Sequence, residues 1–163
     1  MRILKFIIVL LFVGMSITSC QPTYDKQYSW AYPVAGDWAC KAYVGEKLIG
    51  GPYQFKIYNT SMGQDSIWFD DYAGGTPTSS GGKPSFWQFK IKAAVDMSSN
   101  TFQTTGSIST VPKYAINIVV SKGQIIKNDS IYMEVKFQDD PNNTYILKGH
   151  RANTYDDYEK IGY

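Results

Sequence analysis

The sequence is poor in the side chains on which most catalytic and metal sites depend. Its 163 residues include one histidine, His150, and two cysteines, Cys20 and Cys40. A zinc site needs several His, Cys or acidic ligands, and a serine or cysteine nucleophile needs an imidazole as its base. The Gly-x-Ser-x-Gly motif of many hydrolases is also absent. We therefore expect no catalytic residue, no bound metal and no cofactor.

The sequence also lacks a hydrophobic run long enough to span a bilayer. Its one continuous apolar stretch, residues 6–13, is far shorter than the roughly 20 residues that a spanning helix needs. The stretch follows two cations and leads through Ile17-Thr18-Ser19 to Cys20. This order is typical of a bacterial lipoprotein signal peptide. We expect residues 1–19 to be removed and the Cys20 thiol to carry a diacylglycerol, which would attach the protein to a membrane.

Without this leader, the remaining chain has no net charge. The full sequence has 16 Lys and Arg against 14 Asp and Glu, and Arg2 and Lys5 in the leader account for the excess. A neutral domain lacks the basic surface that nucleic-acid binding requires, so we expect no nucleic-acid partner. If Cys20 carries a lipid, Cys40 has no second cysteine for an intramolecular disulfide. Stability must then come from the burial of apolar surface.

Aromatic residues and alternating patterns are what the sequence has in abundance. Aromatics make up 15% of the chain, and such residues favour strands. Between Val34 and Arg151, apolar and polar residues alternate in about nine short segments, as in strands with one buried face. The sequence therefore predicts an all-β antiparallel protein, either a closed barrel of about eight or nine strands or a β-sandwich. We favour the barrel, because closure removes exposed strand edges.

The inward-facing positions of these segments are the candidate ligand-binding residues. A barrel of about eight strands has room inside for packed side chains or for one small ligand. Two interpretations of the inward-facing side chains stay open. They form a packed core, or they line a cavity for a lipid or another apolar molecule. Cys40 falls in the same row and is expected to act as a small apolar residue. The candidate interior residues are Trp38, Phe55, Ile57, Trp87, Phe89, Ile118, Met133 and Phe137.

Three further features suggest weaker hypotheses. Aromatic residues on the outward faces, Tyr43, Tyr58, Trp68 and Tyr132, would stack on sugar rings if they lay together. The acidic pairs Asp70-Asp71 and Asp139-Asp140 are interpreted as solvated turn residues. The glycine-rich stretch 71–85 is interpreted as a surface loop and a candidate lid.

Five segments of the chain resemble one known family: VAGDWACKAY (34–43), SIWFDDY (66–72), FKIKAAVDMSSNTF (89–102), YAINIVVSKGQIIKN (114–128) and DSIYMEVKFQDDPNNTYILKGHR (129–151). They are similar to the Bacteroidetes lipoproteins described as lipid-binding putative hydrolases. The resemblance implies a lipocalin-like (calycin-type) barrel, an N-terminal lipid anchor and a place in the Gram-negative envelope. It supplies no catalytic residues. Of the residues His150-Arg151-Ala152-Asn153-Thr154, at and after the end of the last expected strand, only Arg151 matches the pattern of the family.

The sequence thus predicts a membrane-anchored envelope lipoprotein that binds a lipid or other apolar small ligand without catalysis, at the outer membrane. The alternatives are a carbohydrate-binding or accessory surface lipoprotein, and a hydrolase as the family name suggests. The expected organisation is a signal peptide at 1–19, a lipidated tether at 20–33, a β-barrel domain at 34–151 and a polar tail at 152–163.

Overall fold

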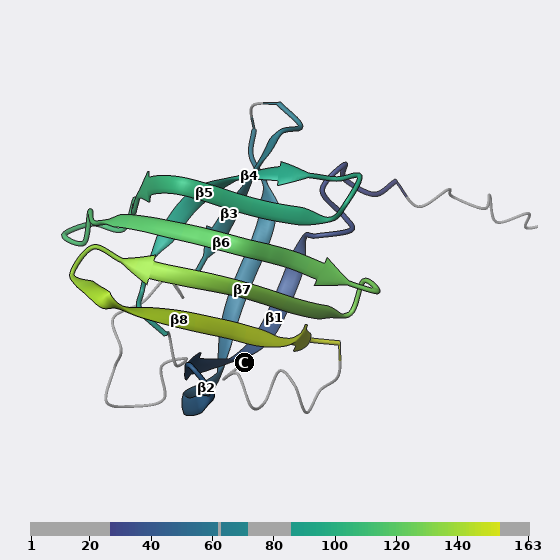
Figure 1. Ribbon diagram of the computed structural model, residues 1–163. Helices are drawn as coiled ribbons and strands as arrows, with labels where there is room; N and C mark the ends of the chain where they lie inside the picture. Colours follow the sequence, from purple (N-terminus) through teal and green to yellow (C-terminus); the bar gives the residue numbers. More distant parts are fainter. Residues whose placement is uncertain (1–26, 62, 72–85, 154–163) are drawn as a thin grey trace, which may run out of the picture.

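The chain forms a closed antiparallel β-barrel (Figure 1). A computed structural model describes residues 27–61, 63–71 and 86–153. Each strand pairs with its neighbours in sequence, and the last pairs with the first. The predicted all-β barrel is confirmed, it is consistent with a lipocalin-like barrel, and the sandwich alternative is wrong. The strands are β1 (Gly36–Val44), β2 (Lys47–Asn59), β3 (Ser66–Asp70), β4 (Lys90–Asp96), β5 (Thr101–Ile108), β6 (Asn117–Ile126), β7 (Ser130–Phe137) and β8 (Asp140–Arg151).

The barrel has eight strands because a segment expected to turn is continuous. The sequence predicts a tight turn at Ser121-Lys122-Gly123, but β6 runs through it with a bulge at Lys122, where φ is 53°. A bulge absorbs an extra residue without ending the strand. Gly123 serves close packing here, since a Cβ atom at this position would lie 2.6 Å from the Phe102 ring. Glycine therefore marks a contact between β5 and β6, and a turn does not occur.

Two hairpin turns are also shorter than the composition suggests. The glycine-bearing turn expected at 45–52 contains only Gly45 and Glu46, and Gly45 has the positive φ of 59° that two-residue hairpins use. The composition also predicts a turn at 139–143, but this turn ends before Asp140. Asp140 is the first residue of β8 and pairs with Phe137, the last residue of β7. Longer strands result in both places, because short turns let more backbone groups pair.

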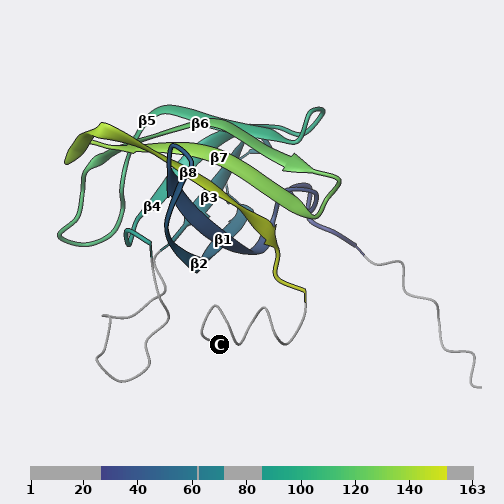
Figure 2. The same cartoon turned by 60° about the horizontal axis from the view of Figure 1, so that its bottom comes forward.

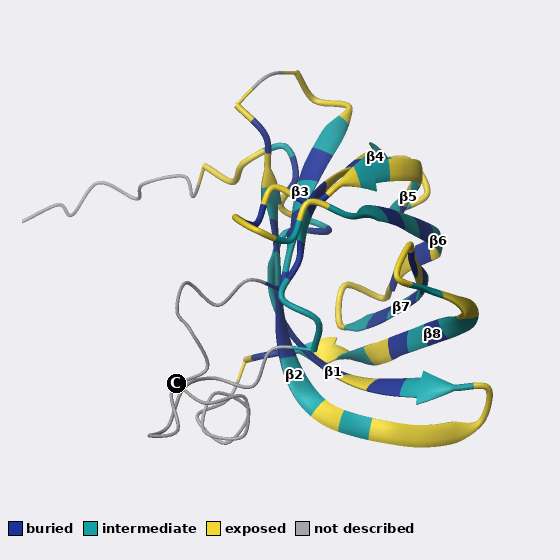
Figure 3. Cartoon of the chain, turned by 90° about the vertical axis from the view of Figure 1, so that its left-hand side faces the viewer, coloured by how far each residue is buried: buried dark blue, intermediate teal, exposed yellow. Residues whose placement is uncertain are grey.

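The barrel interior is occupied by apolar side chains, and Figure 3 shows buried and exposed residues alternating along the strands. Phe55 stacks on Phe69 with ring centroids 5.3 Å apart, and Phe89 contacts Phe69 at 5.5 Å. Cys40 is fully buried in this core. Burial raises the pKa of its thiol, so Cys40 is an apolar core residue, as predicted.

One end of the barrel is closed by the residues that precede β1. Ala31 and Val34 are fully buried there, and the Trp38 indole N–H donates to the Val34 carbonyl at 3.3 Å. This segment lies at the end of the barrel opposite the β7–β8 turn (Figures 1 and 2). We call it the closed end. No helix in the described part of the chain is long and apolar enough to cross a membrane.

Arg151 fastens the closed end. It pairs with Trp38 across β8 and β1, and its guanidinium lies 4.4 Å from the centroid of the Trp38 ring. Its nitrogens donate to the carbonyls of Pro33 (3.1 Å), Asn128 (3.1 Å) and Ala35. One side chain thus satisfies carbonyl groups from two separate segments while covering the indole.

Replacing Arg151 with methionine should open the closed end. The substitution Arg151→Met keeps an apolar stem but leaves these carbonyls without their donor, so we expect the free energy of unfolding to fall by about 2–3 kcal/mol. Urea denaturation measures the loss. The control is Lys148→Met. Lys148 lies on β8, like Arg151, and its ammonium is 4.2 Å from the centroid of the Tyr43 ring. We expect this substitution to lower the free energy of unfolding by less than about 0.5 kcal/mol. Equal losses in the two variants would contradict the assigned role.

Candidate ligand-binding site

The end opposite Arg151 is lined by aromatic side chains. The connections between β3 and β4, β5 and β6, and β7 and β8 all lie at this end, which faces the viewer in Figure 3. Trp87 stacks on Phe137 with centroids 4.4 Å apart and planes 13° from parallel. Phe86 contacts Tyr145 at 5.4 Å and Tyr53 at 5.4 Å. We call this group the aromatic mouth: Tyr53, Phe86, Trp87, Tyr114, Phe137 and Tyr145.

A pocket opens beside the aromatic mouth. Its volume is about 450 Å³, which is within the range of small-molecule sites. One wall comes from the segment before β4 and the other from the β5–β6 connection. Most of the lining residues are aromatic or aliphatic, and polar atoms are as exposed in the pocket as apolar atoms. We call it the mouth pocket, and its lining residues are Phe86, Trp87, Gln88, Val111, Pro112 and Tyr114.

Asp71 holds the first wall in place. The sequence predicts a strand through Trp87, but β4 begins at Lys90 and Gln88 has a positive φ of 57°. The backbone N–H groups of Phe86, Trp87 and Gln88 instead donate to the Asp71 carboxylate at 3.0, 2.6 and 2.9 Å. Asp71 is 1% exposed, so its interpretation as a solvated turn residue is wrong. Successive N–H groups converging on one carboxylate form an anion nest.

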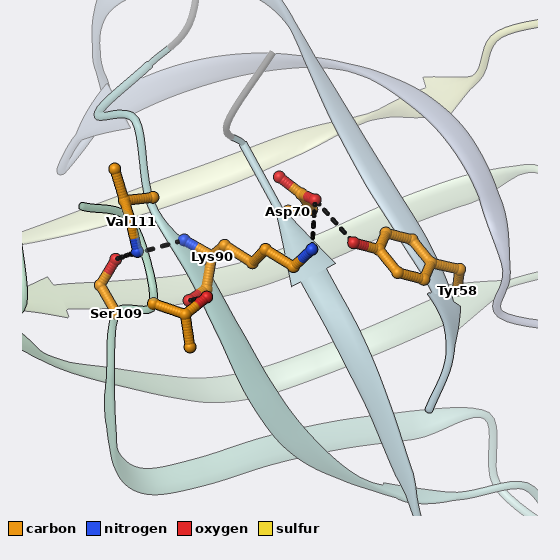
Figure 4. A network of polar contacts seen from close by, with 6 residues as sticks. Tyr58, Asp70, Lys90, Ser109 and Val111 are labelled. Atoms are coloured by element: carbon orange, nitrogen blue, oxygen red, sulfur yellow. Dashed lines mark hydrogen bonds and ion pairs between the residues drawn. The ribbon is translucent and has the colours of Figure 1, made fainter. Parts of the chain in front are cut away.

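The neighbouring Asp70 is also mostly buried, and Figure 4 shows its polar contacts. Its carboxylate accepts the Tyr58 hydroxyl at 2.7 Å and lies 3.5 Å from the Lys90 ammonium. Lys90 also fixes the second wall of the mouth pocket, because its carbonyl accepts the Thr110 N–H at 2.9 Å. Its own N–H donates to the Ser109 hydroxyl at 3.4 Å. The start of β4 therefore positions both walls.

Two tyrosines connect the mouth to the acidic β7–β8 turn. The Trp87 indole N–H donates to the Tyr114 hydroxyl, which donates to Asp139 at 2.5 Å. The Tyr145 hydroxyl donates to Asp140. Burial, reinforced by these carboxylates, raises the pKa of Tyr114 and of Tyr145 to about 12. Both phenols therefore stay protonated at neutral pH and act as donors.

The predicted interior residues divide into two groups. Seven of the eight are fully buried in the core, and Trp87 alone is partly exposed and lines a pocket. Their role in binding a ligand stays a prediction. The sequence analysis missed Phe86, Tyr114 and Asp71. Alternation gives no signal for them, because they lie outside regular strands. Cys20 and residues 72–85 of the predicted lid lie outside the described residues.

The outward aromatics do not form one platform. Tyr58 and Trp68 pair across β2 and β3, whereas Tyr43 lies on β1 and Tyr132 on β7. Lysine side chains lie over three of the rings: Lys90 and Lys92 are each 5.0 Å from the Trp68 centroid, Lys90 is 5.3 Å from Tyr58, and Lys148 is 4.2 Å from Tyr43. These contacts occupy faces that a sugar ring would need.

His150 lies far from the mouth, on an exposed position of β8 near the closed end. It pairs across the strands with Ser130 of β7 and Ala39 of β1. No group of three or more His, Cys, Asp or Glu in the described ranges is arranged to hold a metal ion.

Replacing Asp71 with asparagine should loosen the first wall of the mouth pocket. The side chain keeps its shape, but its amide NH₂ faces backbone N–H groups that need an acceptor. We expect Asp71→Asn to lower the free energy of unfolding by about 2–3 kcal/mol. Trp87 fluorescence should shift toward that of an exposed indole. Asp70→Asn is the control, with an expected loss of about 1 kcal/mol or less. A Trp87 signal unchanged in Asp71→Asn would refute the positioning role.

Comparison with known proteins agrees with this architecture. No curated protein matches the chain. The sequence model of one protein family, described as "Lipid-binding putative hydrolase", matches residues 23–156. The match spans the whole barrel and both ends described above, and it confirms the resemblance seen in the sequence. The chain belongs to the lipid-binding putative hydrolase family.

Proposed function

We propose that this protein is a membrane-anchored envelope lipoprotein that binds a lipid or another apolar ligand at the aromatic mouth, without catalysis. The observation that carries the proposal is the mouth pocket. Partly exposed aromatic rings gather there around a shallow, open pocket of about 450 Å³. Burying such rings against an apolar ligand is favourable, because it removes apolar surface from water.

The geometry supports entry from this end. At the opposite end, the segment containing Ala31 and Val34 covers the core next to Arg151. A second pocket of about 530 Å³ lies toward that end beside β4, β5 and β6, but the aromatic mouth does not contribute to it. Inside the barrel, Phe55, Phe69 and Phe89 contact one another through their rings. Their side chains occupy the space that an internal ligand would need. The apolar part of the ligand therefore lies against Phe86 and Trp87, with its polar part toward the rim.

Binding without turnover is the simplest function for this set of groups. The hydroxyls at the mouth belong to tyrosines that donate to carboxylates, and the one histidine is at the other end. General-base activation of a nucleophile has no geometric basis at the mouth. Membership of a lipid-binding family is consistent with a ligand that carries a long apolar chain.

Removing the Trp87 ring should weaken binding of an alkyl ligand. The probe is the neutral decyl tetraethylene glycol ether, used below its critical micelle concentration and followed by titration calorimetry. We expect Trp87→Ala to weaken binding about tenfold, because an indole contact contributes on the order of 1.5 kcal/mol. Trp87→Phe keeps an aromatic surface and should bind almost as well as the parent protein.

The matched control for this experiment is Trp68→Ala. Trp68 is a partly buried tryptophan on the outer face of β3 and does not line the mouth pocket, so its removal should leave affinity unchanged. Circular dichroism establishes that each variant is folded. Absence of binding by the parent protein, or equal losses in Trp87→Ala and Trp68→Ala, would exclude the mouth as the ligand site.

The membrane attachment depends on Cys20. The residues before Cys20 form a lipoprotein-type leader, so we infer acylation of Cys20 and residence at the outer membrane. In the native host, Cys20→Ala should move the protein from the membrane to the soluble fraction, and the mass of the mature parent chain should include a diacylglycerol. Cys40→Ala, which alters a buried core thiol, should leave the fractionation unchanged. A membrane-bound Cys20→Ala protein would refute the anchor.

A further inference from the structure

We propose that the mouth pocket selects an amphiphile whose head group carries a cationic nitrogen, such as an amine or a quaternary ammonium. This inference rests on the proposed function, and it names the chemistry of the ligand head. It combines three features of the described structure: an aromatic face with no protein cation over it, a pocket lining without a basic side chain, and carboxylates at the rim.

Four other aromatic rings in the described part of the chain, including Tyr58, have a cation over them. Arg151 lies over Trp38, Lys90 and Lys92 lie over Trp68, and Lys148 lies over Tyr43. Among the described residues, no Lys or Arg lies over Trp87 or Tyr114, although both are partly exposed and line the mouth pocket. Electron-rich ring faces attract cations, and tryptophan is the strongest of them. Within the described part of the chain, these two rings thus have no cation partner, and one face of Trp87 stacks on Phe137.

The charges around the mouth pocket favour the same ligand. Among the described residues, the lining contains aromatic, aliphatic and amide groups but no Lys, Arg or His. Asp139 is exposed at the rim, and one of its oxygens accepts the Tyr114 hydroxyl. The nearby Asp140 accepts Tyr145 and Asn143, and these hydrogen bonds lower its pKa. Lys113 lies in the same connection as Tyr114, but it is exposed and does not line the pocket.

An anionic head group would be repelled by the same groups that attract a cation. A carboxylate or sulfate at the rim would face the negative charge of Asp139 and the negative faces of the rings. The Trp87 indole N–H and the Tyr114 hydroxyl, which would be its natural donors, already donate within the protein. The mouth thus discriminates by charge, whereas the apolar chain of the ligand supplies most of the affinity.

Three ligands with the same alkyl chain test the inference: decyltrimethylammonium, decyl tetraethylene glycol ether and decyl sulfate, each below its critical micelle concentration. At low ionic strength we expect the cation to bind about tenfold more tightly than the anion, with the neutral ether between them, from the strength of exposed ion pairs and cation–π contacts. Added salt should reduce this ratio, because the charges are exposed. Anion binding equal to or tighter than cation binding would overturn the inference.

Asp139→Asn provides the second measurement. It should reduce the cation-to-anion ratio about threefold, which corresponds to the loss of one exposed charge interaction. The affinity for the neutral ether, measured in the same variant, reports any effect that comes through Tyr114. The matched control is Asp65→Asn, which removes one exposed carboxylate beside β3 at the closed end and should not alter the ratio. A ratio unchanged by Asp139→Asn, or changed equally by Asp65→Asn, would count against a role for the rim carboxylate.

The two proposals can fail separately. If the neutral ether binds and Trp87→Ala weakens it, the mouth is a ligand site whatever the order of head groups. In that case a missing preference for the cation overturns only the inference about the head. If none of the three ligands binds, or if Trp87→Ala affects none of them, the proposed function itself is wrong.

Discussion

The pairing of β8 with β1 is the constraint on which the rest of the molecule depends. It closes the barrel and places Arg151 opposite Trp38. The two backbones approach so closely that a Cβ atom at Gly149 would lie 1.9 Å from the Ala39 carbonyl oxygen. Only glycine fits such a contact. Without this closure, Arg151 could not reach the segment before β1, and the barrel would present two open edges.

The two ends of the barrel are built by different interactions. At the closed end, the Arg151 guanidinium donates hydrogen bonds to backbone carbonyls of two segments and lies over the Trp38 ring. At the mouth, a buried carboxylate collects backbone N–H groups from the segment that carries Trp87. Both devices satisfy backbone groups that have left the strand ladder. The first covers the core, whereas the second displays aromatic rings beside a pocket.

The strand alternation in the sequence was sufficient to predict the barrel and most of its core. The inward row of β7, from Ile131 to Phe137, is buried as expected. Alternation failed where backbone geometry departs from a regular strand, as at Gly123 and at Asp71. The hydrogen bonds to Asp71 join residues that are 15 to 17 positions apart in the sequence. The hydrogen bond between Trp87 and Tyr114 joins residues that are 27 positions apart. Such contacts follow from how the chain closes in space, and no local pattern encodes them.

The position of the chain entry at the closed end has a consequence for membrane attachment. Only six residues separate Cys20 from Gln27, the first described residue, so an acylated Cys20 would lie within about 25 Å of it even in a fully extended chain. A lipid at Cys20 would therefore attach the chain to the bilayer on the side of the closed end, whereas the mouth lies at the other end of the barrel.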